Sequence, residues 1–496
     1  MDFKTVAESP GTPVPTHESS TGSRWSVLAV TTFGAFVANL DATIVVVALP
    51  TILSGLHTSI ATVIWTLTGY MLVSTILLLP LGWLSDRIGR TRLFLAGFLL
   101  FALGSALAGM ATSGTSLILF RCVQGTGGAL ISGLGTPIIT ETFPREQLGF
   151  ALGLNSFAWV MGSVVGPVAG GILVSSLGWR AIFYVVVPFS LVAFALGLKI
   201  LPRHRPHPSP RTRVDLLGMV LFTTALTLML IVFTEGAGWG WTSPRVLGAG
   251  AMAALSSAWF VWQEMRMAHP MLHLRLFQSR SFAAAQVVVT LASIGFFATT
   301  FLLTFYLQGG LGETPLTTGL LLIALSAPQL LSSPLGGWLA DRLGAGRPML
   351  FGILGLGLGT FLLSHLPDHL VFWSVVGPLA LMACANGLYW PPLASFVMKA
   401  APSAELGAAS GLFYTLRNVG FSLSLTLALV FAETSLPQGT AIRIFLGVHT
   451  AMDPTLSGAL VHAIRTAYAF FTAFFALAAL AAIPMFRRGN SDPALG

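Results

Sequence analysis

Two charged side chains interrupt apolar stretches of this chain, where a charge needs a partner. Asp41 lies in the apolar run at 25–52 and Arg121 lies in the run at 115–141. If both runs are membrane-spanning helices rising about 1.5 Å per residue, Asp41 is slightly outward of the midplane and Arg121 is about 10 Å outward of the midplane of its own helix. A charge at the membrane centre costs about 2.5 to 3.5 kcal/mol on insertion scales. We therefore predict that Asp41 is a proton or cation site and that the long side chain of Arg121 bridges or nearly bridges the gap to it.

Each of these side chains also has a purely structural interpretation. Asp41 would be held by neighbouring polar groups, and Arg121 would extend its side chain toward the outer membrane surface. Arg417 is a third intramembrane charge, in the run at 406–432, and either a structural role or a pathway role fits it. Glu141 falls at the end of a run and is expected to be solvated.

The sequence does not predict metal or cofactor chemistry. None of the ten histidines lies deep in an apolar run, and no GxxxxGK[ST] loop that would bind ATP is present. A membrane-embedded enzyme would need a cluster of catalytic polar groups at one depth, and the apolar runs carry none. We therefore expect no catalytic residues, no metal and no cofactor.

The composition indicates a membrane protein with many spans. Of the 496 residues, 54% are hydrophobic and 8% are charged, whereas soluble domains carry roughly 25% charged residues. Fourteen apolar runs bounded by Gly, Pro or charge predict an all-α membrane protein with 14 transmembrane helices. The runs are at 25–52, 61–81, 93–112, 115–141, 149–176, 181–201, 215–235, 245–263, 282–308, 317–339, 348–366, 370–398, 406–432 and 462–486.

The distribution of basic residues predicts the orientation. With the N-terminus in the cytoplasm, most of the 25 Lys and Arg residues fall in cytoplasmic segments, as the positive-inside rule requires. An even number of spans then leaves both termini in the cytoplasm. The basic excess is therefore a topology signal, and we expect no nucleic-acid partner.

The order of the runs predicts a domain organisation with two related halves. The only sizeable external loop is expected at 434–461. The predicted parts are a disordered cytoplasmic tail at 1–24, a six-helix bundle at 25–201, a basic linker with two extra transmembrane helices at 202–281, a second six-helix bundle at 282–486 and a cytoplasmic tail at 487–496.

A charged, glycine-containing segment follows the second run and recurs after the tenth. The first reads GWLSDRIGRTR (Gly82–Arg92) and the second reads GGWLADRLGAGR (Gly336–Arg347). We expect both to be turns in which a carboxylate caps a helix or pairs with a neighbouring arginine, forming a latch that opens as helices move. Two copies at corresponding places indicate duplicated halves. The predicted latch residues are Gly82, Asp86, Arg87, Gly89, Arg90, Asp341 and Arg342.

Small residues are regularly spaced in the run at 149–176. Gly162, Gly166 and Gly170 recur every four residues and so share one helix face, which permits close packing against another helix. Pro167 is expected to add a kink. Together with Gly171, these residues form the segment GSVVGPVAGG.

Aromatic and polar side chains within the runs are candidates for a cargo pathway, because flat or cationic ligands bind aromatic faces. Most membrane aromatics, however, pack against neighbours or sit at the membrane interface. The candidates are Trp65, Tyr70, Gln124, Trp159, Tyr306, Tyr389, Trp390 and Arg417.

Three of these segments resemble motifs of the major facilitator superfamily. Gly82–Arg92 resembles its signature loop, with Thr91 where a basic residue is common. Arg121–Ala129 (RCVQGTGGA) resembles its Arg-x-x-Gln-Gly-x-Gly motif, which is linked to proton coupling. Gly162–Gly171 resembles the motif that marks the proton-coupled exporters of the superfamily, and so implies export.

Further segments resemble the fourteen-span drug:proton antiporter branch of that superfamily (EmrB/QacA type). LDATIVVVALPTI (Leu40–Ile52) is similar to the first-helix signature of the branch, with Val46 where Asn is common. GWRAIFYVVVP (Gly178–Pro188) is similar to its sixth-helix segment, with Val186 where Asn is common. HPMLHLRLF precedes the ninth run as it does in that branch.

The resemblance implies the major facilitator fold, two six-helix bundles plus two inserted helices, working by alternating access in the inner membrane. It implies a monomeric, proton-coupled multidrug efflux antiporter that exports lipophilic, cationic small molecules within membrane lipid, with a periplasmic adaptor as an optional partner. One alternative is a proton-coupled exporter of a native metabolite, lipid or siderophore. A passive facilitator or importer, and a membrane-embedded enzyme, are more remote alternatives.

Overall fold

The computed structural model describes residues 21–202, 215–267, 270, 274–434, 436, 444 and 454–486. Within these residues the regular structure is entirely helical, and 14 helical segments are long and apolar enough to cross a membrane. The prediction of an all-α protein with 14 transmembrane helices is confirmed. Residues 1–20 of the predicted N-terminal tail, the predicted C-terminal tail, most of the basic linker and most of the external loop at 434–461 lie outside the described residues. The tail was predicted to extend to residue 24, but α1 already begins at Thr21.

Six helices form the first half of the chain, and a hairpin of two helices follows them. The helices of the first half are α1 (Thr21–Gly55), α2 (Ile60–Ile88), α3 (Arg90–Gly109), α4 (Gly114–Thr142), α5 (Leu148–Leu177) and α6 (Ala181–Ile200). The hairpin consists of α7 (Leu216–Trp239) and α8 (Pro244–Arg266). Side chains of Ser59, Ser113, Asp215 and Ser243 cap the first turns of four of these helices, the arrangement expected for short oxygen-bearing residues at helix N-termini.

The second half contains the remaining helices, which are less regular. They are α9 (Arg280–Thr304) with the π-turn η2 (Phe305–Gly310), α10 (Pro315–Leu322), α11 (Gln329–Leu343), α12 (Gly346–Leu363), α13 (Phe372–Ala400), α14 (Leu406–Glu433) and α16 (Pro454–Phe486), with short 3-10 turns η1 (Leu274–Gln278), η3 (Ile323–Leu325) and η4 (Ser403–Glu405). The span predicted at 317–339 is confirmed as one apolar span, Thr317–Leu343, but it is not one regular helix, because the turn η3 separates α10 from α11. Pro328 precedes α11 and disfavours helical geometry at the residue before it. The last span begins at Pro454 rather than at 462.

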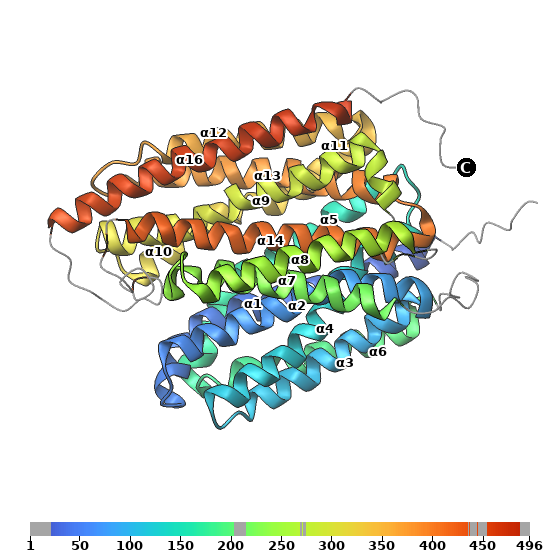
Figure 1. Ribbon diagram of the computed structural model, residues 1–496, viewed down its shortest axis with the longest axis horizontal. Coiled ribbons are helices and arrows are strands. Elements are labelled where there is room, and N and C mark those ends of the chain that lie inside the picture. Colours follow the sequence, from blue (N-terminus) through green and yellow to red (C-terminus); the bar gives the residue numbers. More distant parts are fainter. Residues whose placement is uncertain are drawn as a thin grey trace, which may run out of the picture.

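The helices lie side by side along the long axis of the molecule (Figure 1). α1 packs against α5 and α6, and α3 packs against α4 and α6, so α1–α6 form one group. α9 packs against α14 and α16, and α12 packs against α13 and α16, so the later helices form a second group. The two groups meet where α2 packs against α14 and α5 packs against α11.

The α7–α8 hairpin covers the junction between these two groups (Figure 1). Leu226 and Leu230 of α7 are buried together with Val419 of α14. The hydroxyl of Thr426 on α14 donates to the carbonyl oxygen of Phe233 on α7 at 2.8 Å. The inserted hairpin therefore contacts both halves through α2 and α14.

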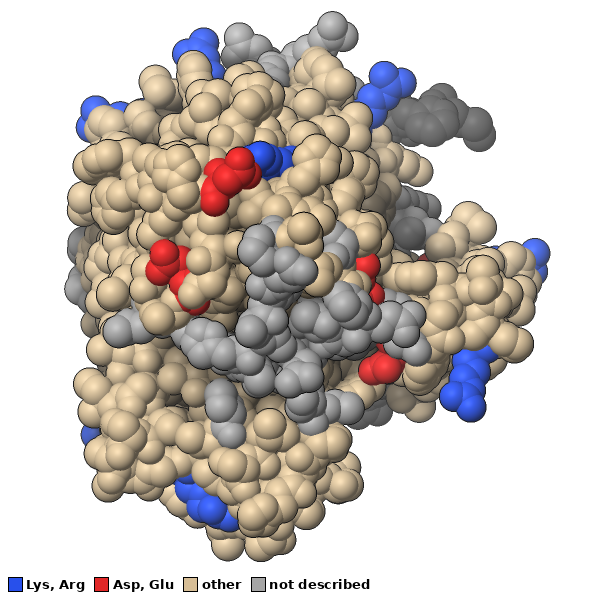
Figure 2. All heavy atoms as spheres, turned by 90° about the vertical axis from the view of Figure 1, so that its left-hand side faces the viewer, with Lys and Arg blue, Asp and Glu red and all other residues tan. Residues whose placement is uncertain are grey.

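One end of the bundle, where α1 ends and α16 begins, is drawn in Figure 2. Its surface is mostly uncharged, with basic and acidic side chains scattered over it. This is the end that the sequence predicts to face outward, and the opposite end carries the latch segments. The orientation itself stays a prediction.

Candidate functional site

Asp41 and Arg121 are paired in the interior of the first half. Nη1 of Arg121 donates to Oδ2 of Asp41 at 2.7 Å. Nε2 of Gln124 donates to Oδ1 of the same carboxylate at 2.8 Å. All three side chains have 0% exposed surface. Both oxygens of a fully buried carboxylate are therefore engaged by donors from α4.

The surroundings of Arg121 explain how the chain tolerates a buried guanidinium. Gln124 is three residues further along α4, so the two side chains share a helix face, and Oε1 of Gln124 accepts from Nη1 of Arg121 at 2.6 Å. Nε of Arg121 donates to the carbonyl oxygen of Thr66 on α2 at 3.3 Å. The ring of Tyr70 lies 4.2 Å from its Cζ. Only Nη2 of this guanidinium has no hydrogen-bond partner.

The geometry distinguishes between the interpretations that the sequence left open for these residues. Arg121 does not extend to the membrane surface but turns inward to Asp41. Gln124 and Tyr70, which we expected along a cargo pathway, lie around this ion pair instead. Thr66 contributes through its backbone, which no side-chain pattern in the sequence could indicate.

The evenly spaced glycines of α5 pack against the helix that carries Asp41. A Cβ atom on Gly162 would meet the backbone of Phe36 and Leu40 on α1, and one on Gly166 would meet the side chain of Thr43. A Cβ atom on Gly170 would likewise meet Ile44. The close approach of these two helices therefore depends on the absence of side chains along this face of α5.

Two other residues of the same segment, Gly171 and Pro167, have different surroundings. Gly171 has no atom within 4 Å of the position that a Cβ would take. Pro167 is exposed, and α5 continues as one helix on either side of it. A polar contact also fixes the two helices, because Nδ2 of Asn39 donates to the carbonyl oxygen of Trp159 at 2.5 Å. Asn39 was not among the predicted site residues, although it lies only two residues before Asp41.

The two latch segments bind across the junction between the halves in the same way. Asp86, near the end of α2, accepts from the backbone N–H groups of Gly407 and Ala408 at 3.0 and 3.1 Å, in the first turn of α14. Asp341, near the end of α11, accepts from those of Gly149 and Phe150 at 2.9 and 2.8 Å, in the first turn of α5. A carboxylate at a helix N-terminus satisfies free N–H groups and the helix dipole.

The latch segments are helical for most of their length, so the prediction that they are turns is wrong. Helix α2 continues to Ile88, and Gly89, with φ of 112°, is the only break before α3. Gly82 lies inside α2, where a Cβ would meet the carbonyl group of Gly407. The last turns of α2 contact α14, and this contact is not visible in the local sequence.

The first latch contains a larger charge network than the second. Arg90 donates to Oδ1 of Asp86 through Nε at 2.8 Å and to the carbonyl oxygen of Ser403 through Nη2 at 2.7 Å. Arg90 also pairs with Glu141, which we had expected to be solvated. In the second latch, Nζ of Lys399 lies 3.3 Å from Asp341.

The remaining latch arginines cover tryptophans of their own helices. Cζ of Arg87 lies 4.0 Å from the ring centre of Trp83, and Cζ of Arg342 lies 4.3 Å from that of Trp338. The spacing of four residues places each pair on one helix face. The repeated arrangement agrees with the sequence similarity of the two segments.

Arg417 occupies a second site, at the junction of the halves. Its Cζ lies 5.0 Å from the ring centre of Trp159 on α5, 5.5 Å from that of Trp390 on α13 and 5.2 Å from that of Tyr414 on its own helix. These are cation–π distances. Three of the predicted pathway residues, Trp159, Trp390 and Arg417, are thus brought together.

The polar contacts of Arg417 are few. Its Nε and Nη2 donate to Oδ1 of Asn418 at 3.3 and 3.2 Å, and Nδ2 of Asn418 donates to the hydroxyl of Thr75 on α2 at 3.1 Å. Arg417 forms no ion pair with any of the described residues. Tyr389 lies close enough to interact electrostatically with it.

Two predicted pathway residues are elsewhere. Tyr306 is fully buried in the second half, and its hydroxyl donates to the carbonyl oxygen of Pro367 at 2.7 Å. Trp65 is partly exposed on α2, beside Thr66 in the chain.

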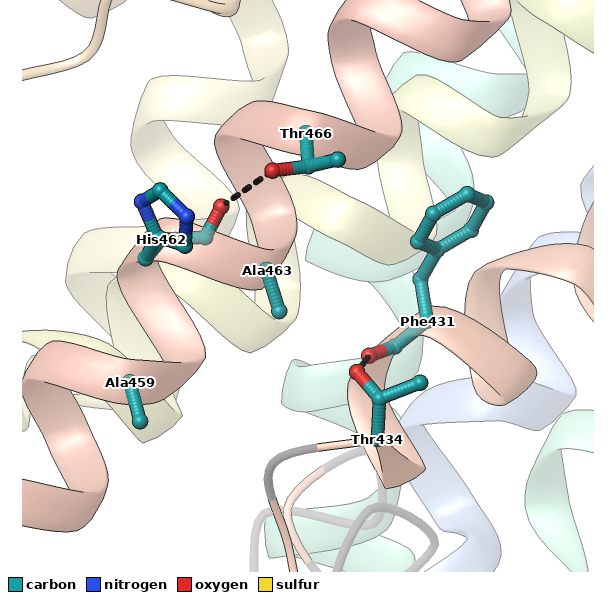
Figure 3. Close-up of a pocket in the computed structure, with 6 residues that line it drawn as sticks. All are labelled: Phe431, Thr434, Ala459, His462, Ala463 and Thr466. Atoms are coloured by element: carbon teal, nitrogen blue, oxygen red, sulfur yellow. Dashed lines mark hydrogen bonds between the residues drawn. The ribbon is translucent and has the colours of Figure 1, made fainter.

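A pocket of the described structure lies apart from both charged sites, between α14 and α16 near the end that the sequence predicts to face outward (Figure 3). Its lining residues are Phe431, Thr434, Ala459, His462, Ala463 and Thr466. Within the described part of the chain, no group of three or more His, Cys, Asp or Glu side chains is arranged to hold a metal ion.

The described residues form 14 apolar spans in two latched halves, with a buried ion pair in one half, and this is the architecture of a secondary membrane transporter. Residues 31–425 match the Major Facilitator Superfamily, and the chain belongs to that family. It is therefore a multi-pass membrane transport protein of a family that carries small molecules.

Relatives of the chain are named as export and transport proteins. It is 33% identical over 406 residues to the Tetracenomycin C resistance and export protein of Streptomyces glaucescens, covering 81% of this chain and 74% of that protein. It is 33% identical over 397 residues to the Multidrug resistance protein Stp of Mycobacterium tuberculosis, covering 80% and 73%. It is 27% identical over 413 residues to the Riboflavin transporter RibZ of Clostridioides difficile, covering 83% and 89%.

Two solved structures share the fold. The proton:xylose symporter XylE superposes with a TM-score of 0.60 at 15% sequence identity, covering 93% of this chain and 95% of that one. The human organic anion transporter MFSD10 superposes with a TM-score of 0.64 at 15% identity, covering 92% and 99%.

Proposed function

We propose that this protein is a proton-coupled antiporter of the inner membrane, with both termini in the cytoplasm, that exports lipophilic small molecules by alternating access. The observation that carries the proposal is the fully buried pair of Asp41 and Arg121, held by Gln124. Removing one partner of a buried ion pair is strongly unfavourable. Protonation of the carboxylate therefore changes the balance of forces on α1 and α4.

The coupling route follows the contacts of α1. A proton that neutralises Asp41 weakens its attraction to Arg121 and frees α1 to move against α4. Helix α1 is in close contact with α5 along the Gly162, Gly166 and Gly170 face. Movement of α1 is therefore transmitted to α5, whose first turn is held by Asp341 of the other half.

In this proposal, the described conformation is the state of the cycle that is closed at the cytoplasmic end. Asp86 and Asp341 join the halves at that end, and the backbones of Gly82 and Gly407 approach closely there. In the proposed cycle a proton enters from the outer side and reaches Asp41, the halves rock, and the latches open. The proton is then released to the cytoplasm, and cargo enters the transporter from the cytoplasm.

The geometry of Asp41 bears on the charge of the cargo. The resemblance to the drug:proton antiporter branch implies a cationic cargo. In the described conformation both oxygens of Asp41 already accept hydrogen bonds. An exporter of a native metabolite is the second candidate, because the relative from Clostridioides difficile is named a riboflavin transporter.

The test is cargo accumulation in proteoliposomes that contain the full chain. Two dyes with the same xanthene ring but opposite net charge, cationic rhodamine 6G and anionic sulforhodamine B, serve as cargo. With an acidic lumen, the native protein accumulates dye in the lumen as protons leave, and Asp41→Asn does not. The variant must still exchange dye for dye without a gradient, which controls for folding. Accumulation by Asp41→Asn at the native level would contradict the proposal.

A further inference from the structure

Arg417 is a positive charge between the two halves that the proton-coupling site does not use. It is only partly buried, and α2, α5, α13 and α14 surround it through Asn418, Trp159 and Trp390. Groups from both halves therefore surround the guanidinium.

The hydrogen-bonding capacity of this guanidinium is mostly unused. A guanidinium has five N–H donors, and the hydrogen bonds of Arg417 to described residues are the two to Oδ1 of Asn418. Its Nη1 donates to none of the described residues. The contrast with Arg121 is direct, because Nη1 of that arginine is bonded to a carboxylate.

A second unpaired donor lies beside the first. Tyr389 is buried, with 3% of its surface exposed, and its hydroxyl has no hydrogen-bond partner. It interacts electrostatically with Arg417. A buried hydroxyl without a partner is unfavourable unless a ligand or water supplies one. Two neighbouring donors therefore lack an acceptor.

The walls of this site are aromatic. Trp159 comes from the first half, and Trp390 and Tyr414 come from the second. Tyr389 and Trp390 also contact each other, with ring centres 6.3 Å apart. Flat rings offer faces on which a planar molecule stacks. Because the rings belong to both halves, a molecule between them would contact both sides of the junction.

We propose that the space around Arg417 binds the cargo, and that the cargo is a planar aromatic molecule carrying an anionic oxygen group, a carboxylate, sulfonate or phenolate. The anionic oxygens accept from Arg417 and Tyr389, and the ring stacks on Trp159 and Trp390. This inference rests on the proposed export function, since it names the substrate class of that transporter.

The site is joined to the proton site by a short path. The carbonyl oxygen of Trp159 accepts from Asn39 at 2.5 Å, and Asn39 is two residues from Asp41 on α1. A shift of α1 on protonation of Asp41 therefore moves one wall of the Arg417 site. The two sites communicate through the packing of α1 against α5 and need no direct contact.

The experiment measures equilibrium binding of the two xanthene dyes to the detergent-solubilised full chain at one pH, by fluorescence anisotropy. Without a gradient, the result does not depend on proton coupling, so it separates a failure of this inference from a failure of the export proposal. We expect sulforhodamine B to bind at least about 10-fold more tightly than rhodamine 6G, the effect of one hydrogen-bonded charge.

Three variants assign the effect to the named groups. Arg417→Gln is expected to weaken sulforhodamine B binding about 10-fold and leave rhodamine 6G binding unchanged, whereas Arg417→Lys keeps part of the preference for the anion. Trp159→Leu removes a stacking face and weakens both dyes. Arg465→Gln is the matched control, because Arg465 pairs with Asp368 outside this site, and it should change neither affinity.

Three results would overturn the inference. One is tighter binding of rhodamine 6G than of sulforhodamine B by the native protein. Another is an equal loss of both dyes in Arg417→Gln, which would indicate a structural arginine. The third is an unchanged anion preference in Arg417→Gln variants that elute as folded monomers in size-exclusion chromatography.

Discussion

Arg121 and Arg417 are both arginines inside the membrane-spanning bundle, yet their surroundings differ. Arg121 has 0% exposed surface and bonds Asp41, Gln124 and the backbone of Thr66. Arg417 is partly exposed and bonds only the amide oxygen of Asn418 among the described residues. An aromatic ring lies near each guanidinium.

The difference indicates two roles for one residue type. In the proposed mechanism, the paired arginine deep in one half loses its ion pair when its partner is protonated. An unpaired arginine between the halves offers charge to a molecule that arrives from outside the protein. In the mechanism that we propose, Arg121 responds to the proton through Asp41, and Arg417 binds the cargo.

The largest difference is expected in stability. Arg121→Gln leaves the carboxylate of Asp41 buried without its cation, which should destabilise the protein by about 3 to 5 kcal/mol. Arg417→Gln breaks no ion pair with the described residues and loses only ring contacts and the hydrogen bonds to Asn418, so it should cost less than Arg121→Gln, about 1 to 2 kcal/mol. Thermal unfolding of both variants in the same detergent gives the comparison. Equal losses would contradict the division of roles.

A double variant sharpens this result. Asp41→Asn combined with Arg121→Gln removes both charges and should recover more than half of the stability that Arg121→Gln loses, because no uncompensated charge remains. The same unfolding measurement applies. If the stability lost by the double variant equals the sum of the losses of the two single variants, the two side chains are not energetically coupled.

The helix contact that links the two arginine sites is tested by a matched pair of glycines. A Cβ on Gly166 would meet Thr43, whereas Gly171 has open space. Gly166→Val should therefore abolish transport and cost about 1 to 3 kcal/mol through overpacking. Gly171→Val should leave dye transport near the native rate. The accumulation assay in proteoliposomes measures both, and equal effects would argue against coupling through this face.

The two latches should differ in strength. Asp86 caps α14 and also pairs with Arg90, whereas Asp341 caps α5 beside a more exposed Lys399. Asp86→Ala should shift the equilibrium toward cytoplasmic opening by about 1 to 2 kcal/mol, and Asp341→Ala by about half as much. Pulsed electron resonance between spin labels at the exposed positions Arg145 and Arg347 reports the opening. A larger effect of Asp341→Ala would reverse this ranking.

The smallest effect concerns the ring beside Arg121. Tyr70→Leu removes a cation–π contact and should lower stability by about 0.5 to 2 kcal/mol, whereas Tyr70→Phe keeps the ring and should change it by less. Unfolding temperatures of the two variants decide this. If Tyr70→Phe is as harmful as Tyr70→Leu, the hydroxyl rather than the ring supports Arg121.

The helices and the charged residues could be predicted from the sequence because hydropathy and membrane charge are local signals. The residues with which these charged side chains interact could not be predicted. Glu141 looked like a solvated helix end and pairs with Arg90, and Gln124 looked like a pathway residue and bonds Asp41. Both depend on which helices pack together. The break before α11 was missed although Pro328 marks it, because the surrounding hydropathy is continuous.

The first latch illustrates the same limit. Its carboxylate was predicted to cap a helix, and it does, but the helix is α14, more than 300 positions along the chain. No spacing rule within Gly82–Arg92 indicates that partner. The similarity of the two latch segments predicted duplicated halves, and only the packing shows that each latch reaches into the other half.

The most direct test of the central claim is proton movement driven by cargo. Proteoliposomes with an entrapped pH-sensitive dye are given an outwardly directed gradient of sulforhodamine B, with a potassium ionophore to clamp the potential. The account predicts that the native protein acidifies the lumen as dye leaves, and that Asp41→Asn releases dye without moving protons. Acidification by Asp41→Asn at the native rate would show that the buried carboxylate is not where the proton is exchanged.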